Sequence, residues 1–175
     1  MSPPDLFHHC PKCGQRAAPP GKAPFHCAAC GFLFYFNPAI AVGAILQAPD
    51  GRVLLVCRAK QPHQGKLTVP GGFVDIRETA EDALRREIRE EVGLHVHALH
   101  YFCSLPNDYH YQGVTYQVLD FFFTGQTPTL DARPDPSEVT EVCWLQPTEI
   151  ELGEIAFPSV RRALEKLIAG VRLKS

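Results

Sequence analysis

The sequence has no long apolar run, no leader-like start and no strong excess of charge of either sign. No stretch approaches the roughly 18 consecutive apolar residues that indicate a membrane-spanning helix. The first ten residues, MSPPDLFHHC, contain no apolar core of the kind that secretory signals carry. The net charge of −2 excludes a strong attraction of the whole chain to membranes or nucleic acids.

The composition is that of one globular protein. With 175 residues, of which 45% are apolar and 21% charged, the chain can bury one core and carry a small appendage. Seven cysteines is a high number, and it is odd. Without a secretory signal, an odd number argues against a disulfide framework, so we expect a cytoplasmic protein with reduced thiols.

Four of the cysteines form two C-x-x-C pairs near the N-terminus, in the similar segments CPKCG and CAACG. They are Cys10, Cys13, Cys27 and Cys30. Four thiolates suit a closed tetrahedral Zn²⁺ site. Residues 1–36 therefore resemble a zinc ribbon whose folding energy comes largely from the metal. The alternative is a redox pair or unrelated thiols, which requires both pairs to be coincidental.

The remainder, residues 37–175, is expected to form one domain of alternating strands and helices. Runs rich in β-branched residues predict strands, a 3.6-residue period predicts helices, and Pro49-Asp50-Gly51 predicts a turn between the first two strands. The expected strands are 39–47, 53–59, 95–104, 114–124 and 139–145, the expected helices are 79–91 and 158–169, and 60–71 is expected to be a loop.

The first predicted helix carries a cluster of carboxylates. At 100° per residue, Glu87, Glu90 and Glu91 fall within a window about 100° wide and project to one side. Crowded carboxylates need a compensating cation, and oxygen ligands without His or Cys favour Mg²⁺ or Mn²⁺. The alternative is an ordinary charged helix with surface ion pairs. That alternative does not explain why Gly72 and Gly93 stand at the positions that the pattern in the next paragraph requires.

Residues 72–94 match the pattern G-x5-E-x7-R-E-U-x-E-E-x-G-U, where U is a bulky aliphatic residue. On this stretch the chain resembles the Nudix hydrolases. The resemblance implies an α/β fold, an α/β/α sandwich on a mixed β-sheet, and hydrolysis of a nucleoside diphosphate linked to another group. It also implies these roles: Glu87, Glu90 and Glu91 as catalytic metal ligands, Glu78 in support of them, Arg86 as the partner of Glu78, and a backbone carbonyl at Gly71 or Gly72 as a further ligand.

A carboxylate outside this stretch is expected to complete the site or to act as general base. The segment SEVTEVCWL resembles the family's E-x-x-E-x-x-W strand entry. It makes Glu138 the first candidate catalytic residue and Glu141 the second. The alternative for each is a glutamate at the exposed edge of a loop.

The sequence is less informative about the substrate. A zinc ribbon before a Nudix domain resembles the NADH pyrophosphatase group, but this chain lacks the run S-Q-P-W-P-F-P-x-S of that group. We favour ADP-ribose or an NADH-like dinucleotide. Most aromatic side chains after residue 100 are expected in the core, whereas Tyr109 and His110 fall in a predicted loop and are candidates for substrate contacts.

Two other functions stay open. One is hydrolysis of nucleotide-capped RNA, with the ribbon contacting RNA, although Lys12, Arg16 and Lys22 are the ribbon's only basic side chains besides histidine. The other is a non-catalytic nucleotide-sensing module, which would be expected to lack some of the carboxylates. For the ribbon we favour a structural or dimerising role, and we expect a homodimer with a nucleotide substrate and no membrane partner.

Overall fold

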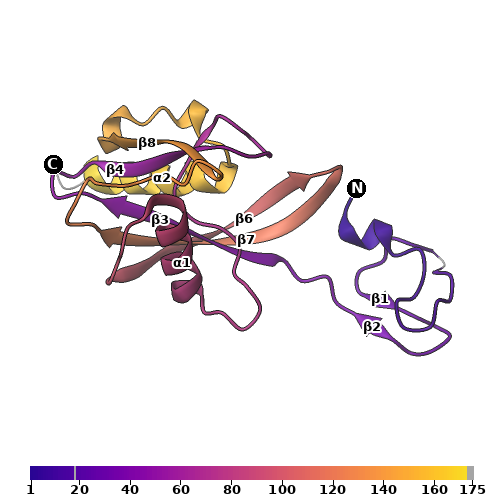
Figure 1. Cartoon of the computed structure of the whole chain (residues 1–175). Helices are drawn as coiled ribbons and strands as arrows, with labels where there is room; N and C mark the ends of the chain where they lie inside the picture. Colours follow the sequence, from indigo (N-terminus) through magenta and orange to yellow (C-terminus); the bar gives the residue numbers. More distant parts are fainter. Residues whose placement is uncertain (18, 173–175) are drawn as a thin grey trace. The chain divides into compact units, whose positions relative to one another are not determined.

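The structure, a computed structural model, describes residues 1–17 and 19–172 (Figure 1). Contacts between residues divide the chain into two compact units. The first comprises Met1–Ala39 and Asp108–Val118, and the second comprises Ile40–Asn107 and Leu119–Ser175. The first unit thus contains the predicted ribbon together with the tip of a hairpin from the middle of the chain.

The ribbon has a small aromatic core beside its cysteines. Its elements are a 3-10 helix, η1 (Pro3–Leu6), and the paired strands β1 (Phe25–His26) and β2 (Leu33–Phe34). The Phe7 ring lies 5.5 Å from that of Phe25, 5.4 Å from that of Phe34 and 4.7 Å from that of Phe36. Apolar packing therefore adds to the folding energy that a bound metal supplies in so short a segment.

Tyr109 and His110 lie in a long β-hairpin and not in the predicted loop. Strand β6 runs over Leu99–Tyr111 and strand β7 over Val114–Gln126. Gln112 and Gly113, with φ of 47° and 79°, form the turn between them. Positive φ at both central residues is the geometry of a two-residue hairpin turn, which lets pairing continue to the tip. The prediction failed because the polar run before Gln112 has the composition of a loop, although hydrogen bonding between strands tolerates it.

The second unit is built on a mixed sheet. Its further strands are β3 (Ala39–Gln47), β4 (Val53–Arg58), β5 (Leu67–Thr68) and β8 (Val139–Leu145). The order is β5-β4-β3-β7-β6, with β8 also paired to β4. Strands β5 and β8 pair antiparallel with β4. Strands β3 and β7 run in the same direction, because Gly43 lies beside Phe122 and Thr127 donates to Gln47 O at 3.0 Å. The short strand β5 lies inside the predicted loop 60–71.

Helix α1 (Ala80–Val92) begins and ends at residues with clear capping roles. Thr79 Oγ1 accepts a hydrogen bond from Asp82 N at 3.1 Å, and Gly93 adopts a φ of 66° after the last turn. Leu84 and Ile88 are fully buried and pack with strands β3 and β4. These two side chains therefore anchor the helix to the sheet.

Helix α2 (Pro158–Arg172) covers the opposite face of the sheet. Phe123 of β7 packs in the cluster under α1, whereas Asp120 accepts a hydrogen bond from Ser159 in the first turn of α2. Residues three apart on a strand face opposite sides, so the two helices sandwich the sheet as predicted. The helices η2 (Pro147–Glu149) and η3 (Leu152–Glu154) precede α2. No helix in the described part of the chain has the length and apolarity needed to cross a membrane.

Asp120 is a buried carboxyl group between the sheet and α2. It is only 8% exposed, and burial raises its pKa, although hydrogen bonds from Ser159 and Asn107 oppose that shift. The folded chain therefore holds the proton of Asp120 to a higher pH than the unfolded chain, in which an aspartate titrates at about 3.9. The unfolded state binds fewer protons in that window, so this group lowers stability as the pH rises through it.

Replacing Asp120 by asparagine is expected to remove this contribution. The free energy of unfolding of the unaltered chain should decrease, relative to that of Asp120→Asn, as the pH rises from about 4 until the folded carboxyl group has ionised. Urea unfolding at a series of pH values measures the difference. Asp131→Asn, at an exposed aspartate, is the matched control, and an equal pH dependence in both variants would contradict the assignment to Asp120.

Candidate active site and zinc centre

Two glycines bring the backbone against the carboxylates of α1. Gly71 has a φ of 148°, and a side chain at this position would collide with the Val42 carbonyl. A Cβ at Gly72 would lie 2.5 Å from Glu87 Oε1. The sequence Pro-Gly-Gly is therefore required both by the backbone angle and by the close approach to Glu87.

Three carboxylates converge beside this turn. One oxygen each from Glu87, Glu91 and Glu138 lies within 4.8 Å of the others. Glu91 Oε2 accepts a hydrogen bond from Gly71 N at 2.9 Å, which fixes its position at the end of α1. The oxygen donors and their spacing fit a hard divalent cation, the chemistry predicted from the sequence.

Burial and mutual repulsion shift the titration of this cluster. Burial raises the pKa of Glu91 to about 8, with the hydrogen bond from Gly71 acting against the shift and the charges of Glu87 and Glu138 adding to it. Burial also raises the pKa of Glu87, although Arg86 opposes the rise. Carboxyl groups crowded in this way ionise together only when positive charge is brought to them, which is what a bound cation does.

The segment before β8 delivers Glu138 to the cluster. Asp135 N donates to Glu91 O at 3.0 Å, and Ala59 N donates to Glu138 O at 2.9 Å. These bonds tie the segment to the last turn of α1 and to the end of β4. Lys60 Nζ lies 3.0 Å from Glu138 Oε1 and orients the carboxylate at the edge of the site.

Arg86 organises the other side of the site. It donates two bonds to Glu78, Nε to Oε1 at 2.9 Å and Nη2 to Oε2 at 2.9 Å. Its Nη1 lies 2.6 Å from Glu87 Oε1, and its Nη2 donates to Phe73 O at 3.1 Å. One guanidinium group thus joins the loop before α1 to the carboxylate cluster, as an arginine with five fixed donors can.

Substituting Arg86 is expected to lower the free energy of unfolding far more than substituting its neighbour Arg85. Arg86→Ala leaves the Glu78 carboxylate, which is 17% exposed, without the group that donates two hydrogen bonds to it, and should lower the free energy of unfolding by clearly more than Arg85→Ala does. Arg85, 40% exposed and paired with Asp82 across one turn, should change it by less than about 0.5 kcal/mol on replacement by alanine. Chemical unfolding of the two variants measures both values, and similar losses would refute the role given to Arg86.

Not every predicted residue joins the cluster. The Glu90 side chain is 52% exposed, and its Oε2 lies 3.2 Å from Arg86 Nη1, so the three converging carboxylates of the described residues do not include it. Glu141 lies within β8, opposite Cys57 of β4. The Gly72 carbonyl accepts a hydrogen bond from Val42 N at 2.9 Å. Tyr109 and His110 lie in β6, where His110 Nδ1 is 2.9 Å from Thr115 Oγ1.

The four paired cysteines of the ribbon converge as predicted. One sulfur from each of them lies within 4.8 Å of the others. Sγ of Cys10 is 3.7 Å from that of Cys30, and Sγ of Cys13 is 3.7 Å from that of Cys27. A tetrahedron with Zn–S bonds of about 2.3 Å has edges of about 3.8 Å. The cluster therefore has the geometry of a zinc site.

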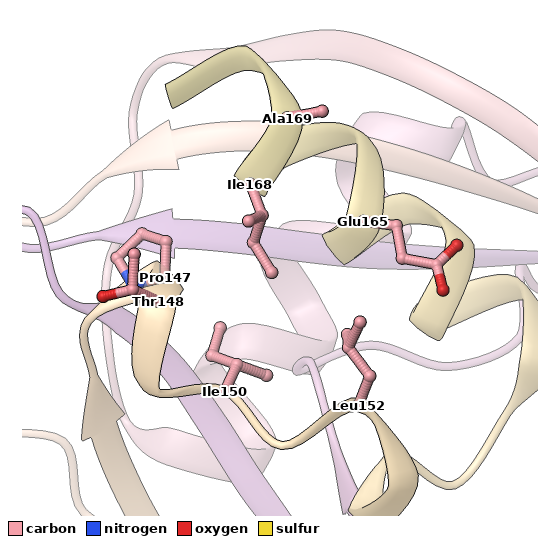
Figure 2. A pocket seen from close by; sticks show the side chains of 7 residues that line it. All are labelled: Pro147, Thr148, Ile150, Leu152, Glu165, Ile168 and Ala169. Atoms are coloured by element: carbon pink, nitrogen blue, oxygen red, sulfur yellow. The ribbon is translucent and has the colours of Figure 1, made fainter. Parts of the chain in front are cut away.

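A pocket of about 500 Å³ lies elsewhere in the second unit, between α2 and the segment before it (Figure 2). Figure 2 shows Ile150 and Leu152 facing Ile168 of α2. The remaining lining residues are Pro147, Thr148, Glu165 and Ala169. None of the predicted site residues lines this pocket, so it is separate from the carboxylate cluster.

Comparisons with known proteins agree with this geometry. The model of the NUDIX domain family matches residues 37–167. An NAD-capped RNA hydrolase, NudC, of Deinococcus radiodurans is 30% identical over 168 residues, 94% of this chain and 58% of that protein. An ADP-ribose pyrophosphatase of Methanocaldococcus jannaschii is 44% identical over 63 residues, 36% of this chain and 37% of that protein. The chain thus spans less than two thirds of these relatives.

A solved structure extends the agreement to the fold. The crystal structure of a NUDIX hydrolase from Nitrosomonas europaea is 26% identical and superposes with a TM-score of 0.71 over 92% of this chain and 90% of that one. The family model alone covers well over half of the present sequence. The chain, with its glycine turn, its carboxylate helix and its four-cysteine ribbon, belongs to the Nudix family.

Proposed function

We propose that the chain is a metal-dependent pyrophosphohydrolase that cleaves the diphosphate between a nucleoside and a second group. The observation that carries this proposal is the convergence of Glu87, Glu91 and Glu138 within 4.8 Å beside the Gly71 turn. Such a cluster serves metal-assisted attack on a phosphoanhydride, for which oxygen ligands are suited. ADP-ribose and NADH-like dinucleotides are the favoured substrates.

In this proposal Mg²⁺ or Mn²⁺ occupies the carboxylate cluster. The ion, when bound, neutralises charge on the diphosphate and lowers the pKa of a coordinated water. Glu87 and Glu91 hold the ion, and Glu90 is a further ligand when more than one ion is bound. A backbone carbonyl at Gly71 or Gly72 is the further ligand; the Gly72 oxygen accepts one hydrogen bond from Val42 N and keeps a second lone pair.

Glu138 is the proposed general base. The oxygen of a water molecule forms a bond to one phosphorus, the bond from that phosphorus to the bridging oxygen breaks, and the proton of the water passes to Glu138. Lys60, 3.0 Å from the Glu138 carboxylate, keeps that group oriented. Arg86 and Glu78 act by positioning Glu87, and Tyr109 and His110 are the proposed substrate contacts outside the carboxylate cluster.

A second candidate substrate is nucleotide-capped RNA. Support comes from the NudC relative, which is named for hydrolysis of NAD-capped RNA and aligns with 94% of this chain. In both reactions the cleaved bond is the same, and only the group beyond the diphosphate differs. A non-catalytic sensor is disfavoured because every carboxylate of the 72–94 pattern, Glu78, Glu87, Glu90 and Glu91, is present. Zn²⁺ in the ribbon, a homodimer and a cytoplasmic location complete the proposal.

A substrate panel tests the proposal. The chain is incubated with ADP-ribose, NADH, a dinucleoside polyphosphate or an NAD-capped RNA, with Mg²⁺ or Mn²⁺, and the products are separated by chromatography. Release of AMP from ADP-ribose or NADH supports the first candidate, and a preference for the capped RNA supports the second. Binding of these compounds without hydrolysis under either metal would favour the sensor.

A further inference from the structure

The ribbon contains a groove that the proposed hydrolysis does not use. Its volume is about 650 Å³, and it is bordered by residues 15–17 and 19, by Lys22, and by residues 24–29. The exposed Pro24, Ala28 and Ala29 give it an apolar lining, with the buried Phe25 and Cys27 beneath, while the exposed polar side chains on it are those of Gln15, Arg16, Lys22 and His26. An apolar surface with basic groups beside it is the combination that a nucleotide unit requires.

The charged side chains that line this groove all have one sign. Arg16 and Lys22 line it, both are exposed, and within the described part of the chain neither forms an ion pair. Asp5, whose Oδ1 is 3.0 Å from the position of a Cβ on Gly21, is the one acidic residue in the sequence of residues 1–36. Its carboxylate already accepts two hydrogen bonds from Ser2, one from N at 2.7 Å and one from Oγ at 2.8 Å.

The charge of the ribbon depends on its metal site. Apart from the cysteines, residues 1–36 contain Lys12, Arg16 and Lys22 against Asp5, a net charge of +2, and the remaining residues carry −4. Four thiolates with one Zn²⁺ contribute −2, so the zinc-loaded ribbon is neutral as a whole. The positive charge on the groove is therefore the local charge of Arg16 and Lys22, on the less acidic part of the chain.

From these observations we infer that the ribbon groove binds the phosphodiester backbone of a single-stranded nucleic acid. Arg16 and Lys22 pair with successive phosphates, the apolar lining receives the sugar or base, and Gln15 and His26 offer hydrogen bonds to their edges. The inference rests on the ribbon alone and not on the proposed hydrolysis.

Binding of a fluorescein-labelled oligonucleotide of about 12 nucleotides to the full chain tests the inference. Fluorescence anisotropy is recorded without divalent metal, so that no hydrolysis is needed, at several salt concentrations and with RNA and DNA in separate arms. The double variant Arg16→Glu with Lys22→Glu should bind at least about tenfold more weakly at low salt. Its slope of log Kd against log salt concentration should be smaller by about 1.4, since each lost contact with a single strand accounts for about 0.7.

Lys12→Glu is the matched control, because Lys12 is an exposed basic residue of the same ribbon that does not line the groove. It should weaken binding by less than about threefold. Equal losses in the control and the double variant would overturn the inference, as would an absence of salt-dependent binding by the unaltered chain. If only the RNA arm binds, the ligand is RNA, and if both bind alike, the backbone alone is recognised.

Zinc content and circular dichroism show whether the double variant keeps its fold. Should it lose zinc, the milder pair Arg16→Gln with Lys22→Gln replaces it. A photo-cross-link from 4-thiouridine RNA to the unaltered chain gives an answer that needs no variant. Cross-linked peptides should map to residues 15–29, and a cross-link confined to residues 40–107 or 119–172 would exclude the groove.

Discussion

Glu91→Gln is expected to lower the turnover of ADP-ribose by about 10³-fold while the chain stays folded. The substitution removes one charge from the three converging carboxylates, and loss of a metal ligand costs several kcal/mol of transition-state stabilisation, where each 1.4 kcal/mol is about tenfold in rate. The amide oxygen of glutamine can still accept the bond from Gly71 N, 2.9 Å from Glu91 Oε2 in the unaltered chain. Initial rates of AMP release with saturating Mg²⁺ measure the loss.

Glu81→Gln provides the matched control for this substitution. Glu81 is an exposed glutamate in the first turn of the same helix, outside the carboxylate cluster. Its replacement should leave turnover within about twofold, since exposed side chains away from the site contribute little. Mg²⁺ should also raise the melting temperature of the unaltered chain and of Glu81→Gln more than that of Glu91→Gln. Unchanged turnover in Glu91→Gln would exclude the cluster as the metal site.

Cys27→Ser is expected to release the zinc and unfold the ribbon. Cys27 is 5% exposed and lies in the small core with Cys10 and Phe25. A serine supplies neither the thiolate nor the apolar contact, and metal binding in such short segments is itself the folding energy, about 10 kcal/mol or more. Metal analysis of the purified chain should fall from about one zinc per chain to almost none, with loss of protection from proteolysis over residues 1–36.

A cysteine outside the cluster separates this effect from a general sensitivity to thiol loss. Cys57 lies in β4 and is half-buried in the second unit. Cys57→Ser should retain the zinc of the unaltered chain, although it removes one thiol, as Cys27→Ser does. If Cys27→Ser also retains full zinc, the four-thiolate site does not exist.

The sequence was most informative where local geometry admits few residue types. The helix predicted over 79–91 corresponds to α1, whose ends are capped by Thr79 and Gly93 because a hydroxyl acceptor and a positive φ are needed there. Gly71 stands where a side chain would collide with the Val42 carbonyl. Glu138 was predicted from a short motif, and the structure brings it to Glu87 although about 50 residues separate them.

The sequence was least informative where pairing between distant segments decides the outcome. The hairpin β6–β7 continues to Gln112 because each strand supplies the partner of the other, while propensity favoured a loop around Tyr109. Helical spacing placed Glu90 with Glu87, but it does not show that Arg86 takes up the Glu90 carboxylate at 3.2 Å. Likewise, Arg16 and Lys22 are six positions apart, and only the folded ribbon shows that they line one groove.

Hydrolysis of ADP-ribose in water enriched in ¹⁸O tests most directly whether the carboxylate cluster cleaves a diphosphate. With Mg²⁺ or Mn²⁺, mass spectrometry should find AMP and ribose 5-phosphate, with a single ¹⁸O atom in the phosphate of one of them, and chelation of the metal should abolish both products. Labelled inorganic phosphate in place of these products, or product formation that persists after chelation, would contradict metal-assisted attack of water on the diphosphate.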